Sequence, residues 1–428
     1  MTRASGPAPF LLRMKFLFIH QNFPGQFRHV AKALANEPTH EVVAIGEAEN
    51  LKRLPQLHPR IKTLAYPAPP PVQAQTHPYL RDFERHVRRG QQVARLCIAL
   101  KERGFEPDVV VVHPGWGEAL FIRDVFPQAR HIHYLEYFYH GTGGDVDFDP
   151  EFPSTVDDKA RVRVKNSTQL PGLVDCDAGI SPTQWQCSRY PQEFRSKIHV
   201  IHEGIDTDAV QPNAQATFAC DGHRFRLGDE VITYVARNLE PYRGFHVFMR
   251  ALPKIQAHSP NAHVVVVGGD DVSYGSHPRN ASNYRELYAA ELGDTVAWDR
   301  VHFVGRVPYP EFVSLMQVSA CHVYLTYPFV LSWSLLEAMS AGALVLASAT
   351  EPVQEVVTSG LNGLLVDFHD TEAIARQVAE VLRQPAAYAA LRQAARETVQ
   401  QRYDLRRQCL PQWLSLLTGR APSLPQGR

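Results

Sequence analysis

Short apolar runs rich in β-branched residues alternate with longer helical stretches along the chain, and this alternation constrains the fold more than any other feature. Several runs, such as the four valines at 109–112, are apolar at every position. Such runs are typical of strands that are covered on both faces, as in parallel sheets. Strands that alternate with helices form βαβ units with right-handed crossovers. The sequence therefore predicts an α/β protein with open parallel sheets.

The predicted strands fall into two sets. The strands of the first set are 15–20, 41–45, 109–113, 130–134, 178–180 and 197–201, and those of the second are 231–236, 263–267, 301–304, 322–325, 344–347 and 364–366. The helices expected between them are 25–36, 81–103, 244–258, 309–318 and 334–341. The Pro-rich stretch 66–78 is expected to be a surface loop.

Two such sets on a chain of 428 residues predict two facing Rossmann-like domains. We place the first domain at 14–205 and the second at 206–400, with 1–13 as a disordered extension and 401–428 as a helical tail that packs back on the first domain. Ligands of open α/β sheets bind beyond the carboxyl ends of the strands. The gap between the two domains is therefore the expected ligand site.

Composition narrows the class of protein. The 44 Lys and Arg balance the 44 Asp and Glu, which argues against nucleic-acid binding through overall positive charge. No apolar run approaches the ~18 residues of a membrane span, and residues 1–13 are too poor in apolar residues for a signal peptide. Six cysteines without a CxxC pair suggest reduced thiols. We therefore expect a cytoplasmic protein without a disulfide frame or zinc site.

The turn after the first predicted strand carries one glycine, Gly25, where a dinucleotide-binding turn would read GxGxxG. This argues against an NAD or FAD enzyme. A single glycine before a helix still lets a ligand approach the backbone N–H groups at the helix start. Gly25 is accordingly a candidate donor-binding residue, and a plain tight turn is the alternative.

Two arginines flank the next candidate turn. Arg237 comes at the end of a predicted strand, and Arg243 comes immediately before the helix that begins near Gly244. Two guanidinium groups at a helix start suit a diphosphate, because each can bind phosphate oxygens bidentately. Glu240 is a candidate for orienting one of the two. A solvated surface loop remains the alternative.

A third candidate segment lies at the start of the helix predicted at 334–341. Ser332, Trp333 and Ser334 lead into this helix, whose first N–H groups favour anionic oxygens. Glu337 follows one turn later among apolar residues, where a carboxylate is costly to bury without partners. The hydroxyl groups of a sugar would be such partners.

The second half resembles the donor half of retaining GT-B glycosyltransferases, with family 4 (group 1) the best match. The similar segments, in order, are VARNLEPYRGF, VVVVGGDD, VHFVGRVPYPEFVSLM, SLLEAMSAGALVLAS and EPVQEVVTSGLNGLLVD. VIHEGIDTD at 200–208 resembles the interdomain signature of this family. The segments HQNFPGQFRHVA, VVVHPGWGEAL and HYLEYFYHGTGGDVDFDPEFP look like a bacterial subgroup. The resemblance thus implies a GT-B fold.

The resemblance also implies residue roles. Arg237 and Arg243 would bind the diphosphate of a nucleotide-sugar donor, Gly268 would border the donor, and Glu337 would hold its ribose hydroxyls as the second Glu of an E-x7-E motif. The first Glu of that motif should stand at position 329, where this chain has Phe329. This departure puts the identity of the sugar in doubt.

In the first half, the family often has a histidine near the reacting sugar, at the end of a later strand. Glu136 stands nearest to that place here, with His133 and His140 on either side. His113 follows the four valines and precedes Gly115 and Gly117. We take Glu136 and His113 as catalytic candidates together with the two arginines, and a structural histidine remains the alternative for His113.

The resemblance implies transfer from a UDP- or GDP-sugar to a hydroxyl of a glycan or lipid-linked acceptor, in polysaccharide synthesis. The leaving phosphate would help to deprotonate the acceptor, and arginines would stabilise its charge without a metal or cofactor. A non-catalytic nucleotide-sugar-binding or scaffold subunit, motivated by Phe329, is the alternative function, and an epimerase of nucleotide sugars is a third.

Two further features leave alternatives open. Asp145, Asp147 and Asp149 form overlapping DxD motifs, the pattern that holds a divalent cation in GT-A enzymes, in a loop expected to belong to the first domain. A solvated acidic loop or an acceptor contact is the preferred interpretation. Five arginines within 81–95 would suit contact with the anionic inner face of a membrane, although a solvated helix face is the commoner outcome.

Overall fold

The computed structural model describes residues 13–53 and 55–419, which divide into two compact units. The first unit runs up to Gly141 and includes Ser154–Glu203 and the residues from Leu410. The second unit consists of Thr142–Pro153 and Gly204–Cys409. The expected N-terminal extension at 1–13 lies, except for Arg13, outside the described residues.

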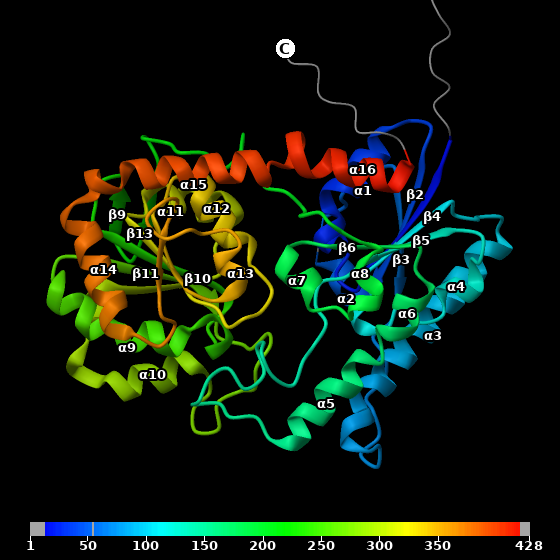
Figure 1. The fold of residues 1–428 in the computed structure, drawn as a ribbon, viewed down its shortest axis with the longest axis horizontal. Helices are drawn as coiled ribbons and strands as arrows, with labels where there is room; N and C mark the ends of the chain where they lie inside the picture. Colours follow the sequence, from blue (N-terminus) through cyan, green and yellow to red (C-terminus); the bar gives the residue numbers. More distant parts are fainter. Residues whose placement is uncertain (1–12, 54, 420–428) are drawn as a thin grey trace, which may run out of the picture. The chain divides into compact units, whose positions relative to one another are not determined.

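The first unit is built on a parallel sheet of seven strands in the order β3-β2-β1-β4-β5-β6-β7 (Figure 1). The strands are β1 Lys15–Ile19, β2 Glu41–Glu47, β3 Ile61–Tyr66, β4 Val109–Val112, β5 Arg130–Tyr134, β6 Ala178–Ser181 and β7 Ile198–Val200. Its helices are α1 Arg28–Asn36, α2 Ala48–Lys52, α3 Arg81–Glu102, α4 Ile122–Val125, α5 Val156–Asn166, α6 Leu170–Asp175, α7 Gln184–Ser188, α8 Gln192–Arg195 and α16 Leu410–Thr418.

The apolar residues of the first sheet are buried on both of its faces, as the continuous runs predict. Along β1, Phe16 and Phe18 pack into one hydrophobic cluster, and Leu17 and Ile19 pack into another on the opposite face. Successive side chains of a strand point to opposite faces, so both faces need a helical cover. Helices α1 and α16 cover the first face, and α3 and α4 cover the second.

The second unit is built on a parallel sheet of six strands in the order β12-β11-β10-β13-β14-β15. The strands are β10 Val231–Asn238, β11 His263–Gly269, β12 Val301–Gly305, β13 Cys321–Tyr324, β14 Val345–Ser348 and β15 Leu364–Val366. The helices are α9 Phe245–His258, α10 Tyr284–Leu292, α11 Tyr309–Val318, α12 Trp333–Ala341, α13 Glu351–Gln354, α14 Thr371–Arg383 and α15 Ala389–Arg402. Two parallel sheets with helices on their faces confirm the predicted α/β class.

Sequence analysis misses three strands. β3 is an edge strand with exposed Lys62 and Thr63, so it lacks the continuous apolar run of the central strands. β8 Thr217–Cys220 and β9 His223–Arg226 form an antiparallel hairpin in the second unit. Asp221 and Gly222 have positive φ angles of 46° and 79° at its turn. An Asp-Gly pair is a strong signal for such a hairpin turn.

The chain returns to the first unit through its last helix, as predicted. Trp413 of α16 is 2% exposed, and its indole N–H donates a hydrogen bond of 3.1 Å to the carbonyl of His202. The ring also packs against Phe27 and Tyr134. Burial of this large apolar surface holds the C-terminal helix against α1.

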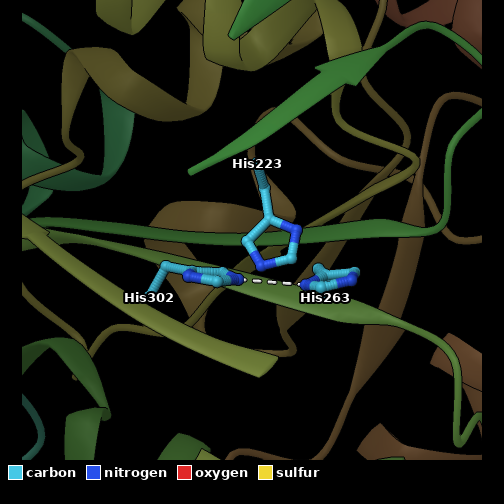
Figure 2. Close-up of side chains that lie close together, drawn as sticks. All are labelled: His223, His263 and His302. Carbon is cyan, nitrogen blue, oxygen red and sulfur yellow. Dashed lines mark hydrogen bonds between the residues drawn. The ribbon is translucent and has the colours of Figure 1, made fainter. Parts of the chain in front are cut away.

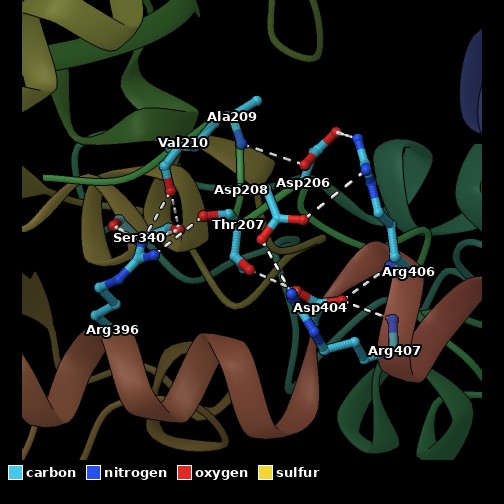
Figure 3. A network of polar contacts seen from close by, with 10 residues as sticks. All are labelled: Asp206, Thr207, Asp208, Ala209, Val210, Ser340, Arg396, Asp404, Arg406 and Arg407. Atoms are coloured by element: carbon cyan, nitrogen blue, oxygen red, sulfur yellow. Dashed lines mark hydrogen bonds and ion pairs between the residues drawn. The ribbon is translucent and has the colours of Figure 1, made fainter. Parts of the chain in front are cut away.

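Within the second unit, a polar network joins the segment 206–210 to the end of α15 and the residues that follow it (Figure 3). Arg396 donates to the carbonyls of Thr207, Val210 and Ser340 at 3.1, 3.0 and 2.7 Å. Asp404 is 1% exposed and accepts from Thr207 Oγ1 and from the Arg407 guanidinium. The end of the segment that resembles the family's interdomain signature is therefore held by the buried Asp404 and the partly buried Arg396.

The acidic loop Thr142–Pro153 belongs to the second unit, whereas the sequence places it in the first domain. Its contacts explain the difference. Asp149 is 3% exposed and lies 2.8 Å from Nε2 of His246 in α9, while Tyr327 Oη donates to it at 2.7 Å. Glu151 pairs with Arg250, also in α9.

None of the helices within 13–53 and 55–419 has both the length and the apolar character needed to span a bilayer.

Candidate functional site

In each sheet, one pair of neighbouring strands marks the point where the strand order reverses. These pairs are β1 and β4 in the first unit and β10 and β13 in the second. The loops that leave the carboxyl ends of such strands diverge, and ligands of open α/β sheets bind in the crevice between them. Nearly all of the sequence-predicted site residues lie in these loops or in the helices that the loops enter.

Arg243 is the most constrained candidate in the second unit. It is 8% exposed, and its Nη1 donates to Thr326 Oγ1 at 2.8 Å and to the Val330 carbonyl at 3.0 Å. Both acceptors follow β13, so this arginine joins the β10 and β13 sides of the switch point. Among the residues that the structure describes, no carboxylate lies within 4 Å of the guanidinium. A buried cation without a counter-ion favours an anionic ligand.

The backbone next to Arg243 explains its placement. Gly244 has a φ of +68°, and a Cβ there would lie 2.4 Å from the Cβ of Leu325. Only glycine allows this backbone conformation so close to Leu325, the residue that follows β13. The turn leads directly into α9, which is 14 residues long and begins with Phe245. Arg243 therefore stands at the start of a long helix, as predicted.

Arg237 has a different environment. It is the last residue but one of β10, and it is exposed. Its guanidinium makes no hydrogen bond or ion pair to other parts of the described chain. The structure therefore places one arginine in a fixed, buried position and leaves the second able to move toward a ligand.

The structure corrects the role expected for Glu240. Its carboxylate accepts hydrogen bonds from the backbone N–H groups of Ser273, Tyr274 and Gly275 at 3.0, 3.1 and 3.0 Å. Glu240 is 1% exposed and thus fixes the loop after β11 instead of orienting an arginine. Three successive backbone N–H groups form a concave anion-binding site, and the Glu240 carboxylate occupies this site.

Gly268 is needed for close packing. A Cβ at this position would lie 2.6 Å from Cδ2 of Leu239 and 3.0 Å from the Ala236 carbonyl. Sequence analysis misses two polar side chains beside it. Arg306 Nη2 donates to Asn238 Oδ1 at 2.8 Å, and Asn238 Nδ2 donates to Ser273 Oγ at 2.9 Å. Asn238 ends β10 and Arg306 follows β12, and this position at a strand end is the signal that could have identified them.

Helix α12 begins at the predicted place. Ser332 is its N-cap and accepts a hydrogen bond from the Ser334 N–H at 3.4 Å. Trp333 is 39% exposed in the first turn, which is unusual for a large apolar side chain. The first turn thus presents hydroxyl groups, backbone N–H groups and an aromatic ring.

Glu337 lies one turn into α12 and is half-buried. Its Oε1 accepts a hydrogen bond of 2.8 Å from the hydroxyl of Tyr309, the first residue of α11. Burial raises the pKa of Glu337, and the Tyr309 hydrogen bond acts in the opposite direction. Tyr309 is 55% exposed and was not identified from sequence.

Phe329 is 3% exposed and lies in an aromatic cluster. Its ring centroid is 4.9 Å from that of Tyr274 and 5.5 Å from that of Tyr242. The Arg243 guanidinium lies 5.9 Å from the Phe329 centroid and 5.5 Å from that of Tyr274. At position 329, where the family carries a carboxylate, this chain therefore has an aromatic ring beside the buried Arg243 guanidinium.

The aspartates of the acidic loop already have partners. Asp145 is 4% exposed and accepts from the Tyr242 hydroxyl at 3.0 Å. Burial alone would raise the pKa of Asp149, but the hydrogen bonds and charge of His246 and the hydroxyl of Tyr327 lower it to about 2. Asp145 and Asp149 are therefore explained by packing of the loop on the residues next to Arg243, which corrects the fully solvated loop that was expected, whereas Asp147 is exposed.

In the first unit, His113 and Glu136 are brought together. His113 follows β4 and Glu136 follows β5, and their Nε2 and Oε2 atoms are 3.2 Å apart. Gln26 donates to the other Glu136 oxygen at 2.8 Å, and its own amide oxygen lies 2.8 Å from His20 Nε2. The four side chains form a continuous polar network at the β1–β4 switch point. His20 and Gln26 were not identified from the sequence, because their partners His113 and Glu136 are more than 90 positions away along the chain.

The charge states in this network differ. Burial, with the neighbouring His113, lowers the pKa of His20 to about 3, so this ring is neutral at pH 7. Burial acts to raise the pKa of Glu136, but the hydrogen bonds from His113 and Gln26 help to lower it overall. The Glu136 carboxylate is therefore ionised near neutral pH and 29% exposed.

Gly25 packs under this network. Its φ is +44°, and a Cβ would lie 2.7 Å from the His20 ring. Gly25 begins a short 3₁₀ helix, Gly25–Phe27, that leads into α1. A side chain at this position would displace His20, so the glycine is explained by packing in the first unit.

The other sequence candidates of the first unit are structural. His133 is 3% exposed in β5, where burial lowers its pKa to about 3, and His140 Nε2 lies 2.7 Å from the Arg189 carbonyl. Arg89, one of the five arginines of the basic stretch, is 5% exposed and pairs with Glu47 at 3.3 Å. Arg85 and Arg88 pair with acidic residues of the same helix. Three of the five arginines are therefore paired with carboxylates of the first unit.

Two family profiles match the chain. Residues 38–210 match the glycosyl transferase family 4 group, and residues 220–398 match the glycosyl transferases group 1. Together with the fold, these matches show that the chain belongs to the family 4 (group 1) glycosyltransferases of GT-B architecture.

Several curated relatives are similar to about half of the chain. A D-inositol 3-phosphate glycosyltransferase of Mycobacterium avium (strain 104) is 30% identical over 202 residues, which cover 47% of this chain and 44% of the relative. A GDP-mannose-dependent alpha-(1-6)-phosphatidylinositol monomannoside mannosyltransferase of Mycolicibacterium smegmatis is 27% identical over 231 residues, 52% of this chain and 57% of the relative. The chain thus spans about half the length of these relatives.

Solved structures share the fold over nearly the whole chain. A sucrose-phosphate synthase from Thermosynechococcus elongatus has a TM-score of 0.69 at 18% identity, covering 95% of this chain and 98% of its own. Anabaena Alr3699/HepE, solved in complex with UDP-glucose, has a TM-score of 0.66 at 17% identity, covering 95% and 99%. At these identities the likeness concerns the fold alone.

Proposed function

We propose that this protein is a retaining glycosyltransferase that moves a sugar from a nucleoside-diphosphate donor to a hydroxyl group of a glycan or lipid-linked acceptor. The observation that carries the proposal is Arg243, a buried guanidinium at the switch point of the second sheet with neutral hydrogen-bond partners only. Such a cation is suited to a diphosphate, whose negative charge it would neutralise.

The reaction would proceed as a front-face substitution. The bond between the anomeric carbon and the β-phosphate oxygen breaks, and a bond from the acceptor oxygen forms on the same face of the sugar. The acceptor proton passes to the leaving phosphate oxygen. Negative charge grows on the diphosphate during this step, so Arg243, the exposed Arg237 and the N–H groups at the start of α12 would lower the barrier.

The donor's other groups have candidate partners on α12. Glu337 would accept hydrogen bonds from the ribose hydroxyls, in competition with or in addition to Tyr309. The exposed ring of Trp333 and the hydroxyls of Ser332 and Ser334 lie in the first turn of the same helix. Gly268 would keep the end of β11 free of side-chain bulk at the edge of this region.

In the first unit, Glu136 and His113 are proposed to contact the reacting sugar or the acceptor hydroxyl. The pair is hydrogen-bonded, and the carboxylate is both ionised and partly exposed. A carboxylate in this state can accept hydrogen bonds from sugar hydroxyls and stabilise positive charge on the sugar ring. Gly25 would support the Glu136 carboxylate indirectly, because the absence of a side chain at this position leaves room for the His20 ring.

The donor is proposed to be of the UDP or GDP type, and neither a metal nor a cofactor is required. HepE was solved with UDP-glucose, and one relative is named as GDP-mannose-dependent with a phosphatidylinositol-based acceptor. Both names support a nucleotide sugar with either base. We further propose a cytoplasmic enzyme of polysaccharide synthesis that contacts the inner membrane face only peripherally.

The proposal is tested by incubating the purified protein with UDP-glucose and GDP-mannose, with and without EDTA, and measuring release of the nucleoside diphosphate. We expect release from one donor, no loss with EDTA, and a product whose anomeric configuration matches the donor by NMR. Binding without turnover of any donor would instead favour a scaffold subunit. Conversion of the free donor to an epimer would favour the third function considered.

A further inference from the structure

Three histidines that are far apart in sequence meet in the second unit, away from the proposed donor site. They are His223, the first residue of β9, His263, the first residue of β11, and His302, the second residue of β12 (Figure 2). The amino ends of β11 and β12 are the opposite edge of the sheet from the carboxyl ends that bear Arg237 and Gly268. The cluster is therefore separate from the donor-binding loops.

The geometry of the cluster is that of ligands around one ion. Nδ1 of His263 and Nε2 of His302 are 3.0 Å apart, and one nitrogen of each of the three rings lies within 4.8 Å of the other two. Zn–N bonds of about 2.0–2.1 Å in a tetrahedral site separate two nitrogens by roughly 3.3 Å. Figure 2 shows the His223 ring directed at the pair formed by the other two. Small side-chain movements would complete the site.

A carboxylate supports the cluster from outside. Nδ1 of His302 lies 2.9 Å from Oδ2 of Asp221, the residue at the turn of the β8–β9 hairpin. A hydrogen bond from Nδ1–H to this carboxylate fixes the tautomer whose Nε2 lone pair points at His263. Metal-binding histidines usually have a carboxylate or carbonyl partner of this kind. His302 is 3% exposed, so its orientation is also fixed by packing.

The charge around the cluster is compatible with a cation. Asp221 and Asp299 contribute negative charge and Arg300 positive charge near the cluster.

We propose that His223, His263 and His302 bind a divalent transition-metal ion, Zn²⁺ in first place, with Asp221 as the group that orients His302. Imidazole donors suit Zn²⁺ and also Cu²⁺, Ni²⁺ and Co²⁺, and three protein ligands leave a position for water. The ion would tie the β8–β9 hairpin to the edge of the six-stranded sheet. Its role would be structural and distinct from sugar transfer.

The test uses the full chain, freed of any histidine tag and of metal by dialysis against a chelator. Zn²⁺ is titrated against a chromophoric competitor, and Co²⁺ is titrated with its visible absorption as the readout. We expect a single site per chain, a tetrahedral Co²⁺ spectrum and a higher Tm for the second unit with Zn²⁺. Wild-type protein that competes no better than the His223→Gln variant overturns the proposal.

The variants separate a metal site from a packing cluster. His223 is exposed, so His223→Gln keeps the fold and should weaken Zn²⁺ binding at least tenfold. Asp221→Asn should weaken it about tenfold or more while leaving the Co²⁺ spectrum tetrahedral. His258→Gln, which removes a histidine at the end of α9 with a 45% exposed side chain, is the matched control and should bind like wild type. If this control loses as much Zn²⁺ affinity as His223→Gln does, the binding belongs to scattered surface histidines and the proposal is overturned.

Discussion

At the residue scale, the site depends on which side chains are buried with partners and which are not. Arg243 and Glu240 are both buried in the same turn, but Glu240 has three backbone donors and Arg243 has only neutral acceptors. The carboxylate is therefore satisfied by the protein itself, whereas the guanidinium retains a full charge. This asymmetry is what makes Arg243 the residue to test first.

Replacing Arg243 with alanine should weaken binding of nucleoside diphosphate by about 30-fold, or about 2 kcal/mol, because a charge-assisted hydrogen bond to phosphate is lost. Calorimetric titration with UDP and GDP measures the effect. Arg243→Lys should recover only part of the affinity, since an ammonium group cannot form the bidentate contact.

The matched control is Arg402→Ala at the end of α15, where the guanidinium is exposed and donates to the Glu355 carbonyl. We expect its titration to equal that of wild type. Affinity that is unchanged in Arg243→Ala would remove this residue from the donor site and with it the main support for the proposed function.

Glu337→Ala should raise the KM for the donor by about tenfold with a smaller change in kcat, because a hydrogen bond to the ribose is made in both the ground state and the transition state. Steady-state kinetics at varied donor concentration measures it. Glu351→Ala, an exposed carboxylate at the start of α13, is the control. Equal KM values for the two variants would reject the ribose role.

The sequence allowed the prediction of residues whose chemistry follows from their place relative to a strand or helix end. Arg243 and Ser332 are such residues, and the structure has them at a helix start and an N-cap. The role predicted for Glu240 was wrong because its hydrogen-bond partners are backbone groups more than 30 positions away. Residue spacing within one segment does not reveal such partners. The three clustered histidines were missed for the same reason.

At the scale of elements, the loop Thr142–Pro153 shows how a few buried contacts decide where a segment packs. Strand positions were largely predictable, because continuous apolar runs define the central strands of both sheets. The loop was misplaced because its chain neighbours belong to the first unit, while its contacts with His246, Tyr242 and Tyr327 belong to the second. Sequence order alone does not determine such a preference.

Asp149→Asn should destabilise this loop by about 2 kcal/mol. This is the free energy that corresponds to a carboxyl pKa that falls from 3.8 to about 2 on folding. Because the folded pKa is the lower one, the carboxylate stabilises the fold above pH 3.8, and this contribution is lost as the pH falls toward 2. Limited proteolysis within Thr142–Pro153 at neutral pH should become faster in the variant.

The control for this loop is Asp229→Asn, an exposed aspartate of the second unit that lies outside the loop. We expect its cleavage rate to stay close to that of wild type. If both variants are cleaved at the same rate as the wild-type loop, the His246 and Tyr327 contacts do not hold the segment, and its packing depends on Phe148 and Phe152 instead.

At the scale of the whole molecule, the two units differ in their buried histidines. Burial lowers the pKa of four histidines in the first unit to about 3 or 4, namely His20, His86, His133 and His202. In the second unit, His322 is the corresponding case, with a pKa of about 4. A histidine that is neutral when folded and has a pKa of 6.5 when unfolded binds its proton only on unfolding. Acid therefore favours the unfolded form.

The sign and size of this effect predict the order of acid unfolding. Stability falls as the pH drops below 6.5, and between about pH 7 and about pH 5.5 each such histidine should cost about 1 kcal/mol. The first unit should therefore lose about 4 kcal/mol and the second about 1 kcal/mol. Calorimetric scans across this range should show the transition of the first unit moving down further than that of the second. Assignment of the transitions by proteolysis of heated samples completes the test, and parallel shifts of both would contradict the prediction.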